Sequence, residues 1–145
     1  MRWLLLSISI LVSDRAWAQE PAPLSAEVVR RGTSTRVVFD VTGAFTEDFR
    51  RRFVGGMTSR ARIRVFLLGP DRRELAEARR ECEMRYDVWD ELVRLEIRDG
   101  GDVQRDMMQL VDRSIRRCGE VELAIGAPAD FARGARLLVG VALNP

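Results

Sequence analysis

Histidine and lysine are both absent from this 145-residue sequence, so every basic residue is an arginine. Without histidine there is no Ser-His or Cys-His nucleophile pair, no histidine-assisted proton transfer near neutral pH and no histidine-ligated metal. Without lysine there is no Schiff base. Carboxylates, hydroxyls, two cysteines and Tyr86 remain as reactive groups, so we expect no enzyme, no metal site and no cofactor.

Net charge is also small, at +2 for the whole sequence. A nearly neutral chain has no overall field to steer it toward nucleic acid, and no stripe of aromatic and basic residues is present. The glycine pairs Gly55-Gly56 and Gly100-Gly101 lack the spacing of a phosphate-binding loop and are interpreted as turns. We therefore expect no nucleic-acid partner and no nucleotide site.

Long apolar runs are scarce, and the one that stands out is at the N-terminus, from Trp3 to Val12. It follows the positive charge of Met1-Arg2 and precedes Ala16-Trp17-Ala18, which together are typical of a secretory signal peptide. Its apolar core is about half of the roughly 20 residues of a membrane-spanning helix. We expect cleavage between Ala18 and Gln19, no transmembrane anchor afterwards, and export to the periplasm or the extracellular space.

Only two cysteines are present, Cys82 and Cys118, and both lie beyond the signal peptide. An even count in an exported chain favours a disulfide, with two buried thiols as the alternative. After a linker over residues 19 to 23, residues 24 to 145 are long enough for a single globular domain. We expect one domain that contains one disulfide, between Cys82 and Cys118.

Alternating apolar residues predict a hairpin over residues 24 to 41, turning at Gly32, and a strand over 60 to 68. Thr46 and the acidic residues after it predict a short helix. Residues 72 to 97 fit either an amphipathic helix or two strands that turn near Asp90-Glu91, and we favour the two strands.

A second helix is predicted over 102 to 118, with Asp102 as its cap, an apolar stripe that includes Val103 and Met107, and Gly119 at its end. Strands over 121 to 125 and 135 to 143 follow, joined by the loop 126 to 134. The expected fold class is α+β: antiparallel and mostly β, with about seven strands and two helices, and a β-sandwich with helical connections as the nearest variant.

Three segments, RARIRVFLL (60–68), CEMRYDVWDELV (82–93) and RLLVGVALNP (136–145), resemble small exported proteobacterial proteins that form a domain family of unknown function. The resemblance implies a periplasmic domain with a mostly β fold and supplies no catalytic residues. Such proteins continue past the Asn-Pro pair, so the resemblance also implies a chain that is truncated at its C-terminus.

Two sets of residues are candidates for a site. Arg60, Arg62 and Arg64 share one strand face and suit phosphate or carboxylate groups, unless Glu81, Glu83 and Asp87 neutralise them across the sheet. Trp89 lies in the other set, where it and Tyr86 either anchor a partner or, as we favour, pack in the core.

The carboxylates around Trp89, at Asp87, Asp90 and Glu91, also allow a carboxylate-dependent hydrolase acting on envelope carbohydrate. Because acidic turn residues are common and no catalytic motif is present, we favour a non-enzymatic binding or accessory module of the cell envelope. Its partner would be an envelope protein or an anionic envelope component.

Overall fold

The structure is a computed structural model that describes residues 9–12, 25–126 and 135–144. Its larger sheet is built from β1 (Ser9–Val12), β4 (Ser59–Leu68), β5 (Glu74–Asp87), β6 (Leu92–Asp99), β7 (Asp102–Met108) and β9 (Arg136–Asn144). Its smaller sheet is built from β2 (Ala26–Arg31), β3 (Ser34–Asp40) and β8 (Glu120–Ile125). The helices are α1 (Glu47–Val54), α2 (Val111–Gly119) and the short 3-10 helix η1 (Thr42–Ala44).

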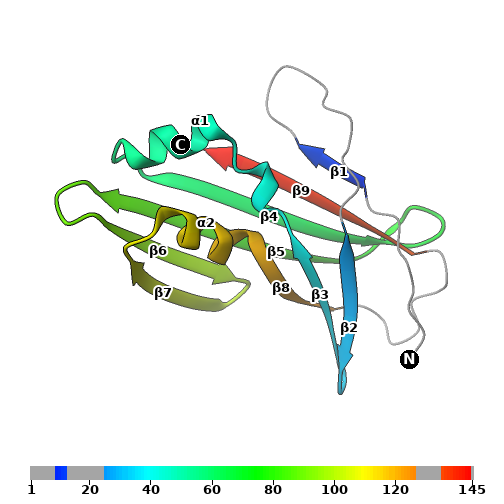
Figure 1. Ribbon diagram of the computed structural model, residues 1–145. Coiled ribbons are helices and arrows are strands. Elements are labelled where there is room, and N and C mark those ends of the chain that lie inside the picture. The colour runs from blue at the N-terminus through cyan, green and yellow to red at the C-terminus, as the bar shows by residue number, and fades with distance from the viewer. Residues whose placement is uncertain (1–8, 13–24, 127–134, 145) are drawn as a thin grey trace.

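The strand order is β1-β9-β4-β5-β6-β7 in the large sheet and β2-β3-β8 in the small one (Figure 1). Neighbouring strands are antiparallel, apart from β1, which runs parallel to β9. The expected mostly-β, α+β class is confirmed. The described residues after the N-terminal segment form eight strands, where about seven were expected, and β1 within that segment is one more. Both predicted hairpins, over 24–41 and over 72–97, are present.

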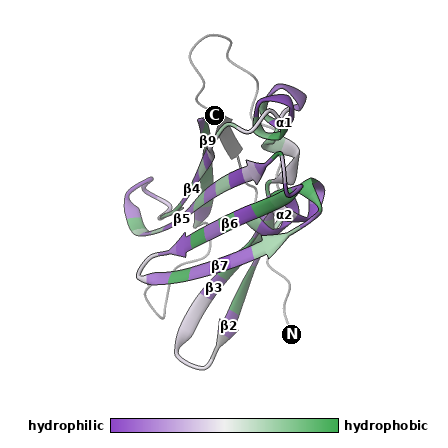
Figure 2. Ribbon diagram, turned by 90° about the vertical axis from the view of Figure 1, so that its left-hand side faces the viewer, coloured by the Kyte–Doolittle hydropathy of each residue, from purple (hydrophilic) through white to green (hydrophobic). Residues whose placement is uncertain are grey.

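β4 shows why the alternating segments become strands. Its residues are buried and exposed in turn, and Ala61, Ile63 and Val65 are fully buried. The arginines between them point to the opposite face, because successive side chains of a strand point to opposite sides of the sheet. Bands of hydrophilic and hydrophobic residues likewise alternate along β6 (Figure 2). The large sheet therefore has an apolar inner face and a charged outer face.

The small sheet and both helices cover that inner face and share one core with it. Val37 and Phe39 of β3 and Val121 and Leu123 of β8 belong to the same cluster of buried residues as the inner side chains of β4. In Figure 1 the small sheet runs crosswise to the large one. Burial of this apolar surface is the main force that holds the layers together.

The first helix follows its sequence signals. The Thr46 hydroxyl accepts a hydrogen bond from the Phe49 amide at 3.2 Å, as expected of an N-cap residue. Phe49 and Phe53 are buried, and the Phe53 ring meets the half-buried Tyr86 ring edge-on at 6.2 Å between centroids. The prediction for α1 is confirmed, and so is the core packing of Tyr86.

The second predicted helix was wrong in its first half. Residues 102–108 form β7, which pairs with β6 across a two-residue turn in which Gly100 has a φ of 62°, and α2 begins only at Val111. Val103 and Met107, assigned to the apolar stripe, are exposed on the outer face. The fourfold spacing of apolar residues is compatible with a helix, but pairing with β6 overrides that local preference.

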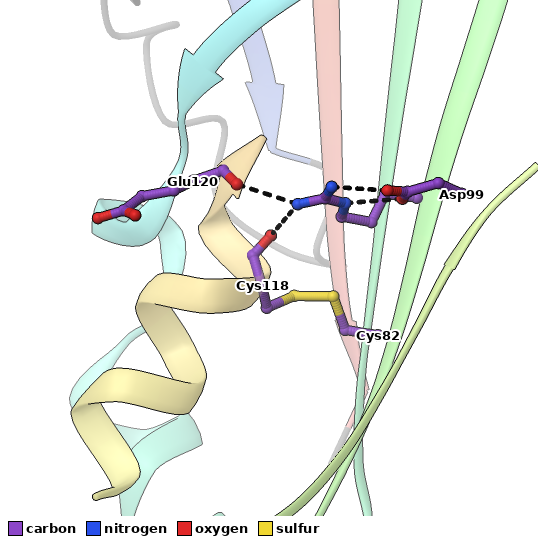
Figure 3. Close-up of a disulfide and its surroundings, with 5 residues drawn as sticks. Cys82, Asp99, Cys118 and Glu120 are labelled. Carbon is purple, nitrogen blue, oxygen red and sulfur yellow. Dashed lines mark hydrogen bonds and ion pairs between the residues drawn. A yellow bond between two sulfur atoms is a disulfide. The ribbon is translucent and has the colours of Figure 1, made fainter. Parts of the chain in front are cut away.

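A covalent bond and a buried ion pair join the large sheet to the end of α2 (Figure 3). Cys82 of β5 and Cys118 of α2 form a disulfide, with their Cα atoms 6.1 Å apart. Beside it, Arg80 donates to both oxygens of Asp99, at 2.7 and 2.6 Å, and to the backbone carbonyl oxygens of Cys118 and Glu120. The predicted disulfide is confirmed, and one arginine links β5 and β6 to the entry into β8.

Part of the expected signal peptide is described. Ser9–Val12 pairs with β9, placing Ser9 opposite Leu138 and Val12 opposite Val141. The cleavage position between Ala18 and Gln19, the linker 19–23 and residues 127–134 of the predicted loop lie outside the described residues.

Replacing both cysteines, Cys82→Ala with Cys118→Ala, should lower the free energy of unfolding by about 3 to 4 kcal/mol, because the bond closes a loop of 36 residues in the unfolded chain. Urea unfolding of the oxidised protein and the double variant measures the difference. Reductant should lower the stability of the wild type by a similar amount and leave the variant unchanged. A variant as stable as the oxidised wild type would contradict the prediction.

Candidate functional site

The three candidate arginines of β4 point outward and are already paired. Arg60 Nε lies 3.0 Å from Glu83 Oε2, and Arg62 Nε lies 3.7 Å from Glu81 Oε1. These two glutamates were the expected partners. The expected pairing of Asp87 with these arginines was wrong, because Asp87 lies at the far end of β5. Arg64 instead stands opposite Arg79 and forms an ion pair with Glu77 at 2.8 Å.

The charged face extends over four strands, from β4 to β7. Its arginines outnumber its glutamates: Arg60, Arg62, Arg64, Arg79, Arg85, Arg94, Arg98 and Arg105 accompany Glu77, Glu81, Glu83 and Glu96. We call these residues the arginine face. Each of its glutamates forms an ion pair with a neighbouring arginine, and because arginines are in excess, some positions keep an uncompensated positive charge.

Arg85 and Arg94 hold the clearest excess. They stand directly opposite each other on β5 and β6, both exposed, and Met107 of β7 comes next in the same row. Within the described residues neither arginine forms an ion pair or a hydrogen bond through its side chain. Like charges directly opposite on neighbouring strands are destabilising, so this pair is a cost to the fold that a bound anion would relieve.

Sequence reasoning missed this pair, although its signal was present. The two-strand interpretation of residues 72–97 placed the turn near Asp90-Glu91, and a turn there brings Arg85 opposite Arg94. The prediction instead weighted the longer arginine run of β4, which the structure pairs with glutamates.

Trp89 lies at the tip of the same hairpin and is 95% exposed, so the expectation that it packs in the core was wrong. The apolar spacing counted Trp89 with the stripe that contains Tyr86, but the chain turns between β5 and β6 and carries the indole beyond the sheet. Val88 beside it is also exposed and lies close to Gly56, just past the end of α1. We call Arg85, Val88, Trp89, Arg94 and Met107 the Trp89 end.

Asp87, a candidate carboxylate, shapes this turn. Its Oδ1 accepts hydrogen bonds from the backbone amides of Trp89 at 3.1 Å and Asp90 at 3.3 Å. Such contacts from an aspartate to amides two and three residues ahead are typical of a turn. Asp90 and Glu91 are exposed on the same turn, and none of the three lines the two cavities described next.

A cleft of about 810 Å³ separates β8 and β3 from β5, β6 and β7. Its walls carry both charges, and several of these are paired with each other: Arg36 with Glu122 at 3.1 Å, and Arg80 with Asp99 on its floor. Small-molecule sites are usually lined by apolar side chains with a few polar groups. This cleft has the opposite balance, which argues against a small organic ligand.

A smaller cavity of about 170 Å³ lies on the arginine face beside Glu96. Arg105 Nε lies 2.7 Å from Glu96 Oε2, and Arg98 pairs with the other oxygen. The hydrogen bond from Arg105, followed by that from Arg98, holds the pKa of Glu96 below its usual range. Glu96 therefore stays ionised and serves to hold two arginines in place.

No protein-family model, no curated protein and no solved structure matches this chain. In the described part of the chain, no group of three or more acidic or cysteine side chains is placed to hold a metal ion, and no helix is long and apolar enough to cross a membrane. Within the described ranges, the Trp89 end consists of two opposed arginines without an ion pair, together with exposed apolar side chains of the same hairpin and of β7.

Replacing Trp89 with alanine should change the free energy of unfolding by less than about 0.5 kcal/mol, because the indole is exposed. Phe53→Ala is the matched control, since Phe53 is fully buried and its truncation should cost about 3 to 5 kcal/mol. Urea unfolding followed by circular dichroism measures both. Equal losses in the two variants would mean that Trp89 is part of the core.

Acid should remove the contribution of Glu96 to stability. Because its pKa is lower in the folded chain than in the unfolded one, the contribution is present above the unfolded pKa and is lost as the pH falls through the folded pKa. Glu96→Gln should therefore be less stable than the wild type near neutral pH, and the difference should shrink in acid. Urea midpoints over a pH series test this, and a difference independent of pH would contradict it.

Proposed function

We propose that this chain is exported to the cell envelope and acts there as a non-enzymatic binding module, which holds an anionic envelope component at the Trp89 end. The observation that carries the proposal is the opposed pair Arg85 and Arg94, which has no ion pair within the described residues, on the hairpin whose turn carries an indole that is 95% exposed. Export is supported by the sequence of residues 1 to 18 and by the Cys82–Cys118 disulfide, since disulfides persist in oxidising compartments.

The partner's chemistry follows from the two kinds of side chain. Guanidinium groups bind phosphate oxygens through two parallel hydrogen bonds, and two guanidinium groups side by side match a phosphate or neighbouring phosphates. The indole and the apolar side chains of Val88 and Met107 need an apolar or interfacial partner, and tryptophan is enriched at the headgroup level of membranes. An anionic membrane surface with phosphate headgroups supplies both.

The acidic residues of the turn limit the size of this surface. Asp90 and Glu91 lie beyond the two arginines, so the Trp89 end is no broad basic patch that attracts anions at long range. Binding must therefore depend on contact with Arg85 and Arg94 rather than on net charge. For the alternative, a carboxylate-dependent hydrolase, no observation speaks in favour: Asp87 is engaged in the turn and its neighbours line neither cavity.

The exported form offers a built-in reporter, because Trp89 is the only tryptophan outside residues 1 to 18. Vesicles of phosphatidylcholine with phosphatidylglycerol should shift its fluorescence to the blue and carry the protein in flotation, whereas phosphatidylcholine alone should do neither. Arg85→Gln with Arg94→Gln should weaken binding by about 2 kcal/mol, or roughly 30-fold, at about 1 kcal/mol for each arginine near the surface.

Arg62→Gln with Arg64→Gln is the matched control, because it removes the same charge from paired arginines of the same face. It should retain most of the binding. Equal losses in both variants would show that only overall charge matters, and equal binding to neutral and anionic vesicles would refute the anionic partner. If inorganic phosphate binds the protein as tightly as the anionic vesicles do, the ligand is a free anion rather than a membrane.

A further inference from the structure

The edges of the two sheets are not protected alike. Exposed edge strands are sites of unwanted pairing, and proteins commonly guard them with charged side chains. β7 carries Asp102, Arg105 and Asp106, β2 carries Glu27 and Arg30, and β8 carries Glu120 and Glu122. β9 has no charged residue from Leu137 to Leu143. It is the one long apolar strand at the margin of a sheet in the described part of the chain.

Within the described residues, β9 is paired on its outer side by only four residues, Ser9–Val12, which lie in the proposed signal peptide. They cover Leu138 to Val141, and no other described residue pairs with the rest of the nine-residue strand on that side. Parallel pairing of this kind is slightly weaker per residue than antiparallel pairing. Cleavage after Ala18 would remove β1 altogether and open the backbone of β9.

We propose that a second copy of this chain then takes the place of β1, its β9 pairing antiparallel with the first and centred on Gly140. This inference rests on the proposed export, because cleavage is what opens the edge. The two β9 strands would be joined by main-chain hydrogen bonds along their length, as in other cases where a strand is added to the edge of a sheet. The pairing joins two five-stranded sheets into one.

The sequence of β9 is self-complementary in this register. With Gly140 at the centre, Val139 stands opposite Val141 of the second copy and Leu137 opposite Leu143, and all four belong to the apolar inner side. On the outer side Leu138 stands opposite Ala142. The space around Gly140 is open, so two glycines can meet there. A twofold contact of identical strands needs no other partner, and such symmetry is the commonest in soluble oligomers.

The geometry adds a consequence for binding. Residues directly opposite in an antiparallel pair point to the same side of the sheet. Both copies therefore turn their arginine faces, and with them Arg85 and Arg94, to the same side. Two Trp89 ends on one side of a joined sheet would engage one surface together, which strengthens binding without any new contact.

The test uses protein expressed from the full-length gene and purified from the exported fraction, with its N-terminus verified by mass. Sedimentation equilibrium should show a dimer for the form that begins at Gln19. A form with blocked cleavage, Ala16→Arg with Ala18→Arg, should remain monomeric because β1 still covers β9. A cleaved wild type that is monomeric would overturn the proposal.

Two paired variants test the register. Leu138→Arg with Ala142→Arg places like charges opposite each other twice, whereas Leu138→Arg with Ala142→Glu places opposite charges there. The first should weaken self-association by roughly tenfold or more relative to the second. Both alter the same two outward positions, so a difference in dimerisation at equal thermal stability cannot come from misfolding. A dimer that is indifferent to both pairs would overturn the β9 interface.

Other occupants of the edge give distinct results. If the cleaved chain stays monomeric but binds a peptide with the sequence of residues 9 to 12, the edge is open and a second copy does not fill it, which overturns the dimer. If the protein is absent from the exported fraction, both this inference and the proposed export fail, whereas an exported protein that retains residues 1 to 18 overturns this inference alone. If a monomeric variant still binds anionic vesicles, the dimer alone is affected and the proposed function stands.

Discussion

The Cys82–Cys118 bond and the Arg80 ion pair beside it join two layers that also meet through apolar packing and through the contacts of Arg117 on α2 with Gln104 and Asp106 of β7. Arg80 neutralises the charge of Asp99 on β6. It also donates hydrogen bonds to two backbone carbonyl oxygens where α2 passes into β8. Only 9% of the Arg80 side chain is exposed, so its charge must be fully compensated to be tolerated. The position of the small sheet, and of the cleft next to it, depends on this junction.

The arginine face illustrates how little most surface charges contribute individually. Exposed ion pairs such as Arg60–Glu83 are worth a fraction of a kilocalorie per mole and weaken with salt. Their main effect here is to engage the three arginines of β4, so that within the described residues Arg79, Arg85 and Arg94 are the members of the arginine face without an ion pair, and of these Arg85 and Arg94 stand opposite each other. Uncompensated charge on this face thus lies at the positions where no glutamate stands beside an arginine, rather than following the density of arginine.

Much of the fold was accessible from sequence because two-sided strands carry a strong pattern. Residues 60–68 alternate without interruption, and the two-strand interpretation of 72–97 was correct. Residues 102–108 were not predictable in the same way, because Val103 and Met107 satisfy a helical spacing while their strand pairing depends on β6, a neighbour defined by the turn at Gly100. The disulfide was predicted from the number of cysteines and the expected compartment.

The candidate site was harder to predict because it depends on which residues face each other. Arg85 and Arg94 lie nine positions apart and become neighbours only through the register of one hairpin. The exposure of Trp89 depends on the same turn. A large aromatic residue in an apolar pattern is usually buried, and that general tendency gave the wrong answer where the chain reverses.

The arrangement of charges along β4 and β5 has a consequence for how the sheet finds its pairing. In the native alignment the arginines of β4 at 60, 62 and 64 face two glutamates and one arginine, and sliding β5 by two residues toward either end again presents two glutamates and one arginine. The outer charges therefore cannot distinguish the correct alignment from its nearest competitors. Discrimination falls to the inner face, where Ala61 leaves room beside Cys82 that Ile63 would overfill. In the native alignment the small side chain of Ala61 therefore stands beside Cys82, at the place where the disulfide fixes the strand to α2.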